Sequence, residues 1–177
     1  MSNLEIKAAL HDVRRARRAL SAIGARRARP DLLQTDWYFG VPAGRLKLRR
    51  PGAGCGAELI AYARPDTRRA RVSDFVRLPV SDPAAALRLL GSMLGVRVRV
   101  RKRRELWRFD NARIHLDRVT GLGTFLEIEV VVTMGLTQAR ALMRSLTREL
   151  GIDKADLVGA SYSDLLLAGT GSSRPRS

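Results

Sequence analysis

Polar and apolar residues alternate in short stretches along most of the chain, and this period-two pattern predicts β-strands. In the first stretch, Asn3, Glu5 and Lys7 share one face and aliphatic residues occupy the other. Turn signals rich in Pro and Gly separate the stretches, and the short loops favour antiparallel neighbours. About eight strands are expected, at 3–8, 34–39, 45–49, 58–64, 71–76, 95–107, 113–119 and 125–132.

Other stretches carry apolar residues at three- and four-residue spacing, which is typical of amphipathic helices. Asp82 followed by Pro83 is a favourable helix start, and Gly24 and Gly151 are favourable stops. The helices are expected at 12–23, 82–94 and 137–150, with a short apolar element at 164–167. We expect one domain over 1–168, and a disordered tail of Gly, Ser, Arg and Pro over 169–177.

Several expected strands carry charges of both signs on one face and aliphatic residues on the other. Any one of them could belong to a half-exposed sheet with its charged face in water. Together they also fit a closed eight-stranded antiparallel barrel of the α+β class, with charged side chains inside and helices outside, whose interior could hold a small ligand. The charged faces include Arg45, Lys47 and Arg49; Arg113, His115 and Asp117; and Glu127 and Glu129.

The chain is strongly basic, with 33 Lys and Arg against 17 Asp and Glu and a formal net charge of +16. Such a surplus suggests a polyanionic partner, which could be nucleic acid, polyphosphate or an acidic membrane. One cysteine, Cys55, excludes an internal disulfide and a Cys-based zinc site. Without a signal-peptide pattern or a run of about 18 apolar residues, we expect a cytoplasmic protein that does not span a membrane.

A set of segments, taken in order and with their spacing, resembles one family over most of the chain, from Asn3 to about Leu167. They are Leu4-Glu5-Ile6-Lys7, residues 34–39, Gly44 to Arg49, Glu58-Leu59-Ile60, residues 102–105, Arg113 to Val119, Leu122 to Glu129 and Ser161 to Leu166. In these segments the chain resembles the CYTH family of triphosphate tunnel metalloenzymes, nearest to bacterial class IV adenylyl cyclases. The resemblance implies a nucleoside or inorganic triphosphate as substrate, and a homodimer as a frequent assembly.

The resemblance also implies a divalent metal, Mg²⁺ or Mn²⁺, held by glutamates of the first and last strands. Carboxylate oxygens suit such hard cations, which keep open positions for phosphate. The expected ligands here are Glu5, Glu127 and Glu129. Asn3 stands where the family motif has another glutamate, so one tightly held ion is the safer expectation.

Basic residues of the inward faces are the phosphate ligands that the resemblance implies. Arginine engages two phosphate oxygens through its fork, and lysine acts as a mobile point charge. Arg64 is included because Tyr62 stands where many members have a lysine. The expected set is Lys7, Lys47, Arg49, Arg64, Lys102, Arg104 and Arg113.

The expected catalytic residues are Glu5, Lys7 and Asp117. Asp117 could either orient a basic neighbour or contact a metal-bound water, and His115 could titrate or be structural. The arginines that are out of phase with Lys102 and Arg104 should decorate the exterior, namely Arg97, Arg99, Arg101 and Arg103.

Such a lining predicts a triphosphate substrate better than it predicts the bond that is broken. The segment pattern favours conversion of ATP to cyclic AMP and pyrophosphate, with hydrolysis of inorganic, thiamine or nucleoside triphosphate as the alternative. A non-catalytic binder of polyphosphate or nucleic acid is a further alternative. Aromatic residues make up only 5% of the chain, which disfavours recognition of single-stranded nucleic acid.

Overall fold

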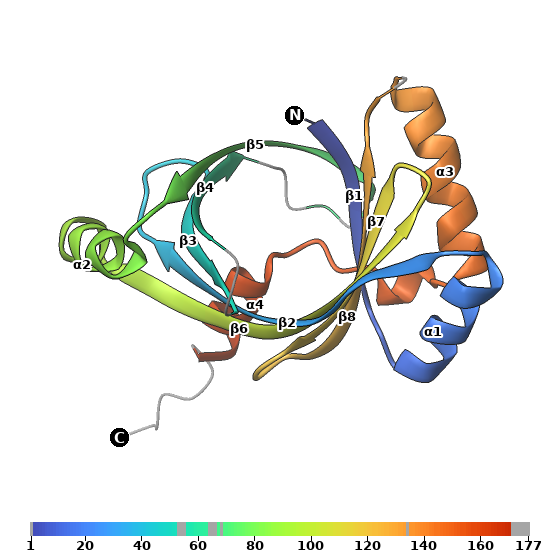
Figure 1. The fold of residues 1–177 in the computed structure, drawn as a ribbon, viewed down its shortest axis with the longest axis horizontal. Helices are drawn as coiled ribbons and strands as arrows, with labels where there is room; N and C mark the ends of the chain where they lie inside the picture. The colour runs from blue at the N-terminus through green and yellow to red at the C-terminus, as the bar shows by residue number, and fades with distance from the viewer. Residues whose placement is uncertain (1, 53–55, 64–66, 68, 134, 171–177) are drawn as a thin grey trace.

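The computed structural model describes residues 2–52, 56–63, 67, 69–133 and 135–170, and within them the expected α+β class is confirmed (Figure 1). Eight strands form one curled antiparallel sheet, and helices pack outside it. The strands are β1 (Ser2–Ala9), β2 (Arg26–Phe39), β3 (Arg45–Pro51), β4 (Ala57–Ala63), β5 (Arg71–Val80), β6 (Val96–Phe109), β7 (Ala112–Val119) and β8 (Gly123–Val131). The helices are α1 (Val13–Ala22), α2 (Pro83–Leu94), α3 (Leu136–Glu149), the 3-10 turn η1 (Lys154–Asp156) and α4 (Tyr162–Thr170).

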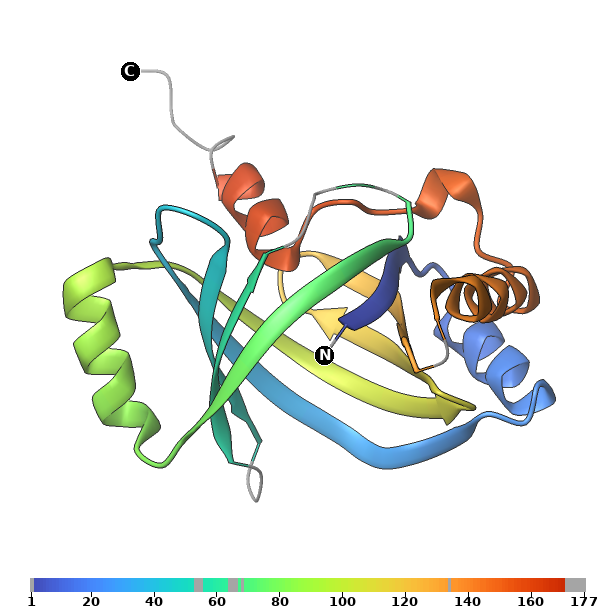
Figure 2. The ribbon, with the colours of Figure 1, turned by 90° about the horizontal axis from the view of Figure 1, so that it is seen from above.

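The hydrogen-bonded strand order is β1-β5-β4-β3-β2-β6-β7-β8, and it returns to β1 as the expected barrel requires. The two ladders of β1 differ in length, since seven residue pairs join β1 to β8 and four join it to β5. Beyond Asp74, the described pairs of β5 are with β4 alone, so the curl stays open along that part of β5. The expected closed barrel is thus found in the strand order, through the short ladder between β1 and β5, while the sheet stays open beside the rest of β5 (Figure 2).

Strand β2 is the largest departure from the sequence pattern, because it begins at Arg26 rather than Gln34. Its first half carries Pro30 and lacks regular alternation, and its ladder with β6 shifts register between Arg27 and Arg29 and between Arg29 and Leu32. Such bulges break the period-two pattern by which a strand is identified from sequence. Pairing with the long β6 strand, and not local alternation, accounts for this segment.

Helix ends follow the expected signals closely. Asp82 accepts hydrogen bonds from the backbone N–H groups of Ala84 and Ala85, and Asp12 accepts one from Arg15. Helix α4 is longer than the short apolar element expected, and Gly169 and Thr170, expected in the tail, are its last residues. The remainder of the expected tail, 171–177, lies outside the described residues. No helix in the described part of the chain is long and apolar enough to cross a membrane.

The main apolar core lies outside the curl, between the sheet and helices α1 and α3. The aliphatic faces of β1, β7 and β8 contribute fully buried side chains such as Leu4, Ile114 and Ile128. Leu20 of α1 and Leu146 of α3 cover them. Because the sheet buries its aliphatic face here, its charged face is turned toward the inside of the curl, as the alternation predicts.

Replacing Leu20 by alanine should lower the free energy of unfolding by about 2–5 kcal/mol, because a fully buried leucine leaves a cavity. The matched control is Leu89→Ala in α2, where the side chain is 60% exposed and the expected change is within about 0.5 kcal/mol. Urea unfolding of both variants measures the difference. If Leu20→Ala lowered the free energy of unfolding as little as Leu89→Ala does, α1 would not be part of the core.

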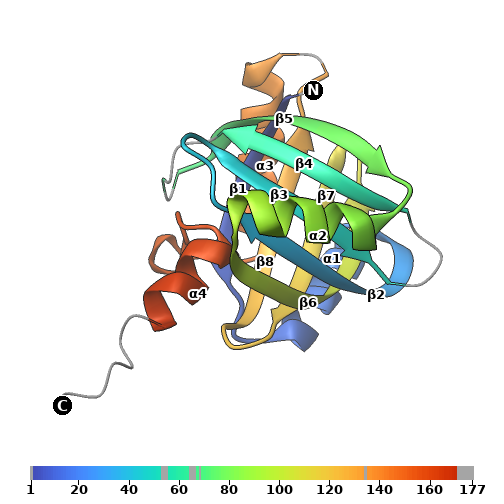
Figure 3. The same ribbon diagram turned by 90° about the vertical axis from the view of Figure 1, so that its left-hand side faces the viewer.

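Helix α2 lies on the opposite side of the molecule from α1 and α3, across strands β2 and β3 (Figure 3). None of its residues is fully buried, and Leu89 and Met93 are largely exposed. Val76 and Leu78 of β5 are also exposed. The outer face of the sheet is therefore covered by packed helices at β1, β7 and β8, and is less covered at β3, β4 and β5.

Candidate active site

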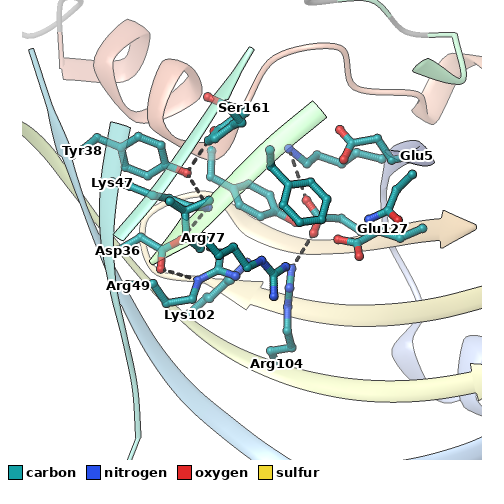
Figure 4. Close-up of a pocket in the computed structure, with 17 residues that line it drawn as sticks. Glu5, Asp36, Tyr38, Lys47, Arg49, Arg77, Lys102, Arg104, Glu127 and Ser161 are labelled. Carbon is teal, nitrogen blue, oxygen red and sulfur yellow. Dashed lines mark hydrogen bonds and ion pairs between the residues drawn. The ribbon is translucent and has the colours of Figure 1, made fainter. Parts of the chain in front are cut away.

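The inside of the curl holds a cavity lined by side chains from β1 to β6, β8 and the start of α4 (Figure 4). Most of these side chains are charged or carry a hydroxyl group. Aromatic residues fill part of the wall, namely Tyr38, Tyr62, Phe75 and Tyr162. The acidic residues that line it are Glu5, Asp36, Glu127 and Glu129, and the basic ones are Lys7, Lys47, Arg49, Arg77, Lys102 and Arg104.

The acidic side of the cavity is built by strands β1 and β8. Their ladder places Glu5 opposite Glu129 and Lys7 opposite Glu127. Cross-strand partners on one face have Cβ atoms about 4.5–5.5 Å apart, so the register alone brings these carboxylates together. The three glutamates expected to hold a metal therefore share one region of the cavity.

Lys7 joins the acidic side to the rest of the lining. Its Nζ atom lies 3.5 Å from Glu127 Oε1, donates a hydrogen bond of 3.1 Å to the carbonyl oxygen of Ala160, and sits 3.9 Å from the ring centroid of Tyr162. The side chain is almost fully buried. Lys7 is thus fixed in place by groups from β8, from the segment before α4 and from the first residue of α4.

One group of basic residues is organised by Asp36 of β2. Arg49 donates to both carboxylate oxygens of Asp36, at 3.0 and 2.9 Å, and Lys47 Nζ lies 3.1 Å from Asp36 Oδ2. Burial by itself would raise the pKa of Asp36, but Arg49 and Lys47 outweigh it and hold that pKa well below its usual value. Asp36 is therefore a fixed negative charge that holds two cations toward the cavity.

Asp117 organises a second group of basic residues in the same way. Arg104 donates to both of its oxygens at 2.6 Å, Lys102 donates at 3.0 Å, and the hydroxyl of Tyr162 donates at 3.1 Å. Asp117 is completely buried and does not line the cavity. Its position favours the first of the two roles expected from sequence, in which it orients basic neighbours.

Arg104 also reaches across to the acidic side, where its guanidinium pairs with Glu127. Burial would raise the pKa of Glu127, yet Arg104 and Lys7 hold it well below the usual range. The acidic and basic sides of the cavity are thus in direct contact through Arg104.

Lys47 is the basic residue whose charge is most open to change. Burial, followed by the repulsion of neighbouring Arg49, lowers its pKa to about 7, while Asp36 opposes the shift. Its ammonium group also donates a hydrogen bond of 3.3 Å to the Tyr38 hydroxyl. The ionisable groups around it are Asp36, Tyr38, Arg49, Tyr62 and Lys102.

This pKa predicts a proton-linked step in anion binding. A polyanion raises the pKa of Lys47, so above pH 7 binding takes up about one proton, and affinity falls by up to about tenfold per pH unit. Calorimetry from pH 7 to 9 measures the affinity of tripolyphosphate for the wild-type protein and for Lys47→Arg. The ionisation of the ligand itself affects both proteins equally, so it cancels when the two slopes are compared. The arginine variant should lack the extra slope, and identical slopes would contradict the prediction.

Other expected residues have different outcomes. Arg113 does not line the cavity and instead pairs with Glu129 at 2.9 Å, so its position supports the acidic side. Asn3 is buried and lines the cavity beside Glu5. Arg64 lies outside the described residues. The exterior position expected for the alternating arginines is confirmed, since all four are exposed: Arg97, Arg99, Arg101 and Arg103.

Several lining residues were not assigned a role from sequence. Asp36 and Tyr38 share one face of β2, and Trp37 between them lies on the other face. This pattern cannot show that Asp36 pairs with Arg49 of the next strand. Arg77 follows Phe75 on the inner face of β5, in a stretch broken by Pro79. Tyr162 lies far from the strands in sequence, and only the fold brings it to the cavity.

The fold and site define an α+β protein whose curled antiparallel sheet encloses a buried cavity of mixed charge. The chain belongs to the CYTH family, because the CYTH domain model matches residues 1–162. This confirms the resemblance expected from the sequence.

Solved structures share the fold. The PH1012 protein from Pyrococcus horikoshii is 25% identical with a TM-score of 0.83, over 92% of this chain and 98% of that one. A protein from Vibrio parahaemolyticus, described provisionally as an adenylate cyclase, is 20% identical with a TM-score of 0.76, over 93% and 97% of the two chains. HpAC1 from Hippeastrum, named as a provisional adenylyl cyclase with a dominant triphosphatase activity, is 18% identical with a TM-score of 0.63, over 98% of each. No curated protein matches the chain.

Proposed function

We propose that this protein is a divalent-metal-dependent enzyme that holds a triphosphate inside the curled sheet and acts as a class IV adenylyl cyclase, converting ATP to cyclic AMP and pyrophosphate. The observation that carries the proposal is the division of one cavity into an acidic side and a basic side. Buried charges need partners, and a metal bound to a polyanion supplies a partner for each side.

The basic side is suited to a chain of phosphates. Lys47 and Arg49 come from β3, and Lys102 and Arg104 come from β6, so cations approach the cavity from more than one wall. Asp36 and Asp117 hold these side chains in place, which lowers the cost of ordering them when an anion binds. Arg77 and Lys7 add positive charge from β5 and β1.

The acidic side is suited to the cation. Glu5, Glu127 and Glu129 are the expected ligands, and Mg²⁺ or Mn²⁺ fits a set rich in carboxylate oxygens. When bound, the cation would lower the pKa of the ribose 3′-hydroxyl and neutralise phosphate charge. A triphosphate would also compete for Arg104, which in its absence is paired with Glu127.

In the cyclase reaction, the 3′-oxygen attacks the α-phosphorus, the bond from that phosphorus to the bridging oxygen breaks, and pyrophosphate leaves with the electron pair. The hydroxyl proton passes to solvent or to a carboxylate of the acidic side. Catalysis by the protein itself is positioning and charge neutralisation, because the phosphoryl group carries the developing charge. Lys7, held by Glu127 and by the carbonyl oxygen of Ala160, would stabilise that charge.

Hydrolysis of a triphosphate is the second candidate, in which a water attacks the γ-phosphorus and orthophosphate is released. The observation in its favour is that HpAC1, which shares the fold, carries a cyclase name but is described with a dominant triphosphatase activity. The same lining serves both reactions, since they differ in which phosphorus is attacked. A homodimer, expected from the resemblance, stays a prediction.

The test is a product analysis with ATP, GTP, inorganic triphosphate and thiamine triphosphate, each with Mg²⁺ and with Mn²⁺. Cyclic AMP with an equal amount of pyrophosphate is expected from ATP, whereas orthophosphate would establish hydrolysis instead. Lys102→Ala should reduce turnover strongly, and its matched control is Arg101→Ala, the exposed neighbour on the same strand. No turnover of any triphosphate, together with tight and salt-sensitive RNA binding, would replace the proposal with a nucleic-acid binder.

A further inference from the structure

His115 of β7 lies beside the acidic side of the cavity and takes no part in the roles assigned above. In the β7–β8 ladder it stands opposite Glu127, two residues along the strand from the pair formed by Arg113 and Glu129. Its side chain is only 7% exposed. Its Nδ1 atom is fully buried and makes no hydrogen bond among the described residues.

An unpartnered buried nitrogen of this kind costs about 1–3 kcal/mol, so its position calls for an explanation. Nδ1 lies 3.7 Å from Glu127 Oε2 and 3.8 Å from Glu129 Oε1, which is too far for a hydrogen bond. Ligands bound to one ion at about 2.0–2.2 Å can be about 4.2 Å apart, so both gaps suit a shared cation. Ligand atoms of His115, Glu127 and Glu129 all lie within 4.8 Å of one another.

The surroundings favour the neutral imidazole, which is the form that binds metals. Arg113 and Arg104 already pair with Glu129 and Glu127, so neither carboxylate requires a protonated histidine for neutralisation.

We propose that His115 Nδ1, together with Glu127 and Glu129, coordinates the divalent cation, which makes the site a mixed nitrogen and oxygen site that prefers Mn²⁺ and Co²⁺ to Mg²⁺. This inference rests on the metal dependence of the proposed function. Mg²⁺ favours oxygen ligands and gives up water reluctantly, whereas transition-metal ions accept imidazole readily. Asn3 contributes no charge at the head of β1, so the set has fewer carboxylates to favour Mg²⁺.

The chain offers a clean control, because it contains only two histidines, His11 and His115. His11 lies on the exterior, with Nε2 3.0 Å from Asp156 Oδ1. The experiment uses the full chain without a histidine tag, loaded with Mn²⁺ alone. Pulsed electron paramagnetic resonance then detects the coupling between bound Mn²⁺ and an imidazole nitrogen, and calorimetry gives the Mn²⁺ and Mg²⁺ affinities.

Imidazole coupling is expected in wild type and in His11→Gln, and it should disappear in His115→Gln. The same variant should lose on the order of tenfold or more in Mn²⁺ affinity, with a much smaller change for Mg²⁺. Mn²⁺ that binds wild type without imidazole coupling would overturn the inference even if no variant folds, and would leave the proposed function standing. Failure of wild type to bind Mn²⁺, with or without tripolyphosphate, would overturn both.

Discussion

Glu129→Gln is expected to lower metal-dependent turnover of the triphosphate by roughly 10³-fold, equivalent to about 4 kcal/mol of transition-state stabilisation. The substitution keeps the shape of a side chain that faces Glu5 in the sheet but removes the charge that a cation requires. Binding of tripolyphosphate without metal should be unchanged or tighter, because the cavity loses a negative charge. Steady-state kinetics and calorimetry measure the two effects separately.

The control is Glu149→Gln, which removes a half-exposed carboxylate at the end of α3 and should leave both quantities unchanged. A fall in turnover together with unchanged or tighter metal-free binding of tripolyphosphate is the result expected only for a residue that holds the cation. If Glu129→Gln retained full turnover at limiting Mn²⁺, the assignment of the acidic side to the metal would be wrong.

Asp117→Asn should lower the free energy of unfolding by about 3–5 kcal/mol, since breaking a buried ion network leaves charges without compensation. Asp117 is fully buried and holds Lys102 and Arg104 through hydrogen bonds of 2.6–3.0 Å. Added tripolyphosphate should restore part of the loss, because it can neutralise the same two cations. Urea unfolding with and without the anion checks both statements.

Asp156→Asn is the matched control, because its carboxylate pairs with His11 near the surface and a change within about 1 kcal/mol is expected. A variant of Asp117 that unfolds like the control but loses turnover would assign this residue to the chemistry. That outcome would favour the second role considered from sequence, contact with a metal-bound water.

The pH dependence of stability follows from the same network. Arg104 and then Lys102 outweigh burial and hold the pKa of Asp117 well below its value in the unfolded chain. The unfolded state therefore binds more protons as the pH falls through the ordinary Asp range, and the stabilisation by Asp117 is present above that range and lost below it. In Asp117→Asn this part of the acid dependence is absent.

The sequence predicts the parts of this fold that rest on local periodicity. The alternation in 3–8 and 125–132 identifies both strands and also which face carries the glutamates, because a strand with one buried face has a fixed register. Asp82 and Pro83 similarly identify the start of α2. These signals lie within a few residues of the features they specify.

The rest depends on contacts between distant segments. The first half of β2 is a strand because β6 pairs with it, despite Pro30 and the register shifts. Asp36 is a candidate only once β3 places Arg49 opposite it. The unpartnered nitrogen of His115 can be recognised only in three dimensions, since the sequence favours a structural histidine at this position.

The most direct measurement is a crystal structure of the protein with Mn²⁺ and a non-hydrolysable ATP analogue, with the metal located by its anomalous scattering. We expect a metal peak beside Glu127 and Glu129, and phosphates in contact with Lys47, Arg49, Lys102 and Arg104. A cavity without ligand, with phosphates bound instead along the exposed arginines of β6, would contradict this expectation.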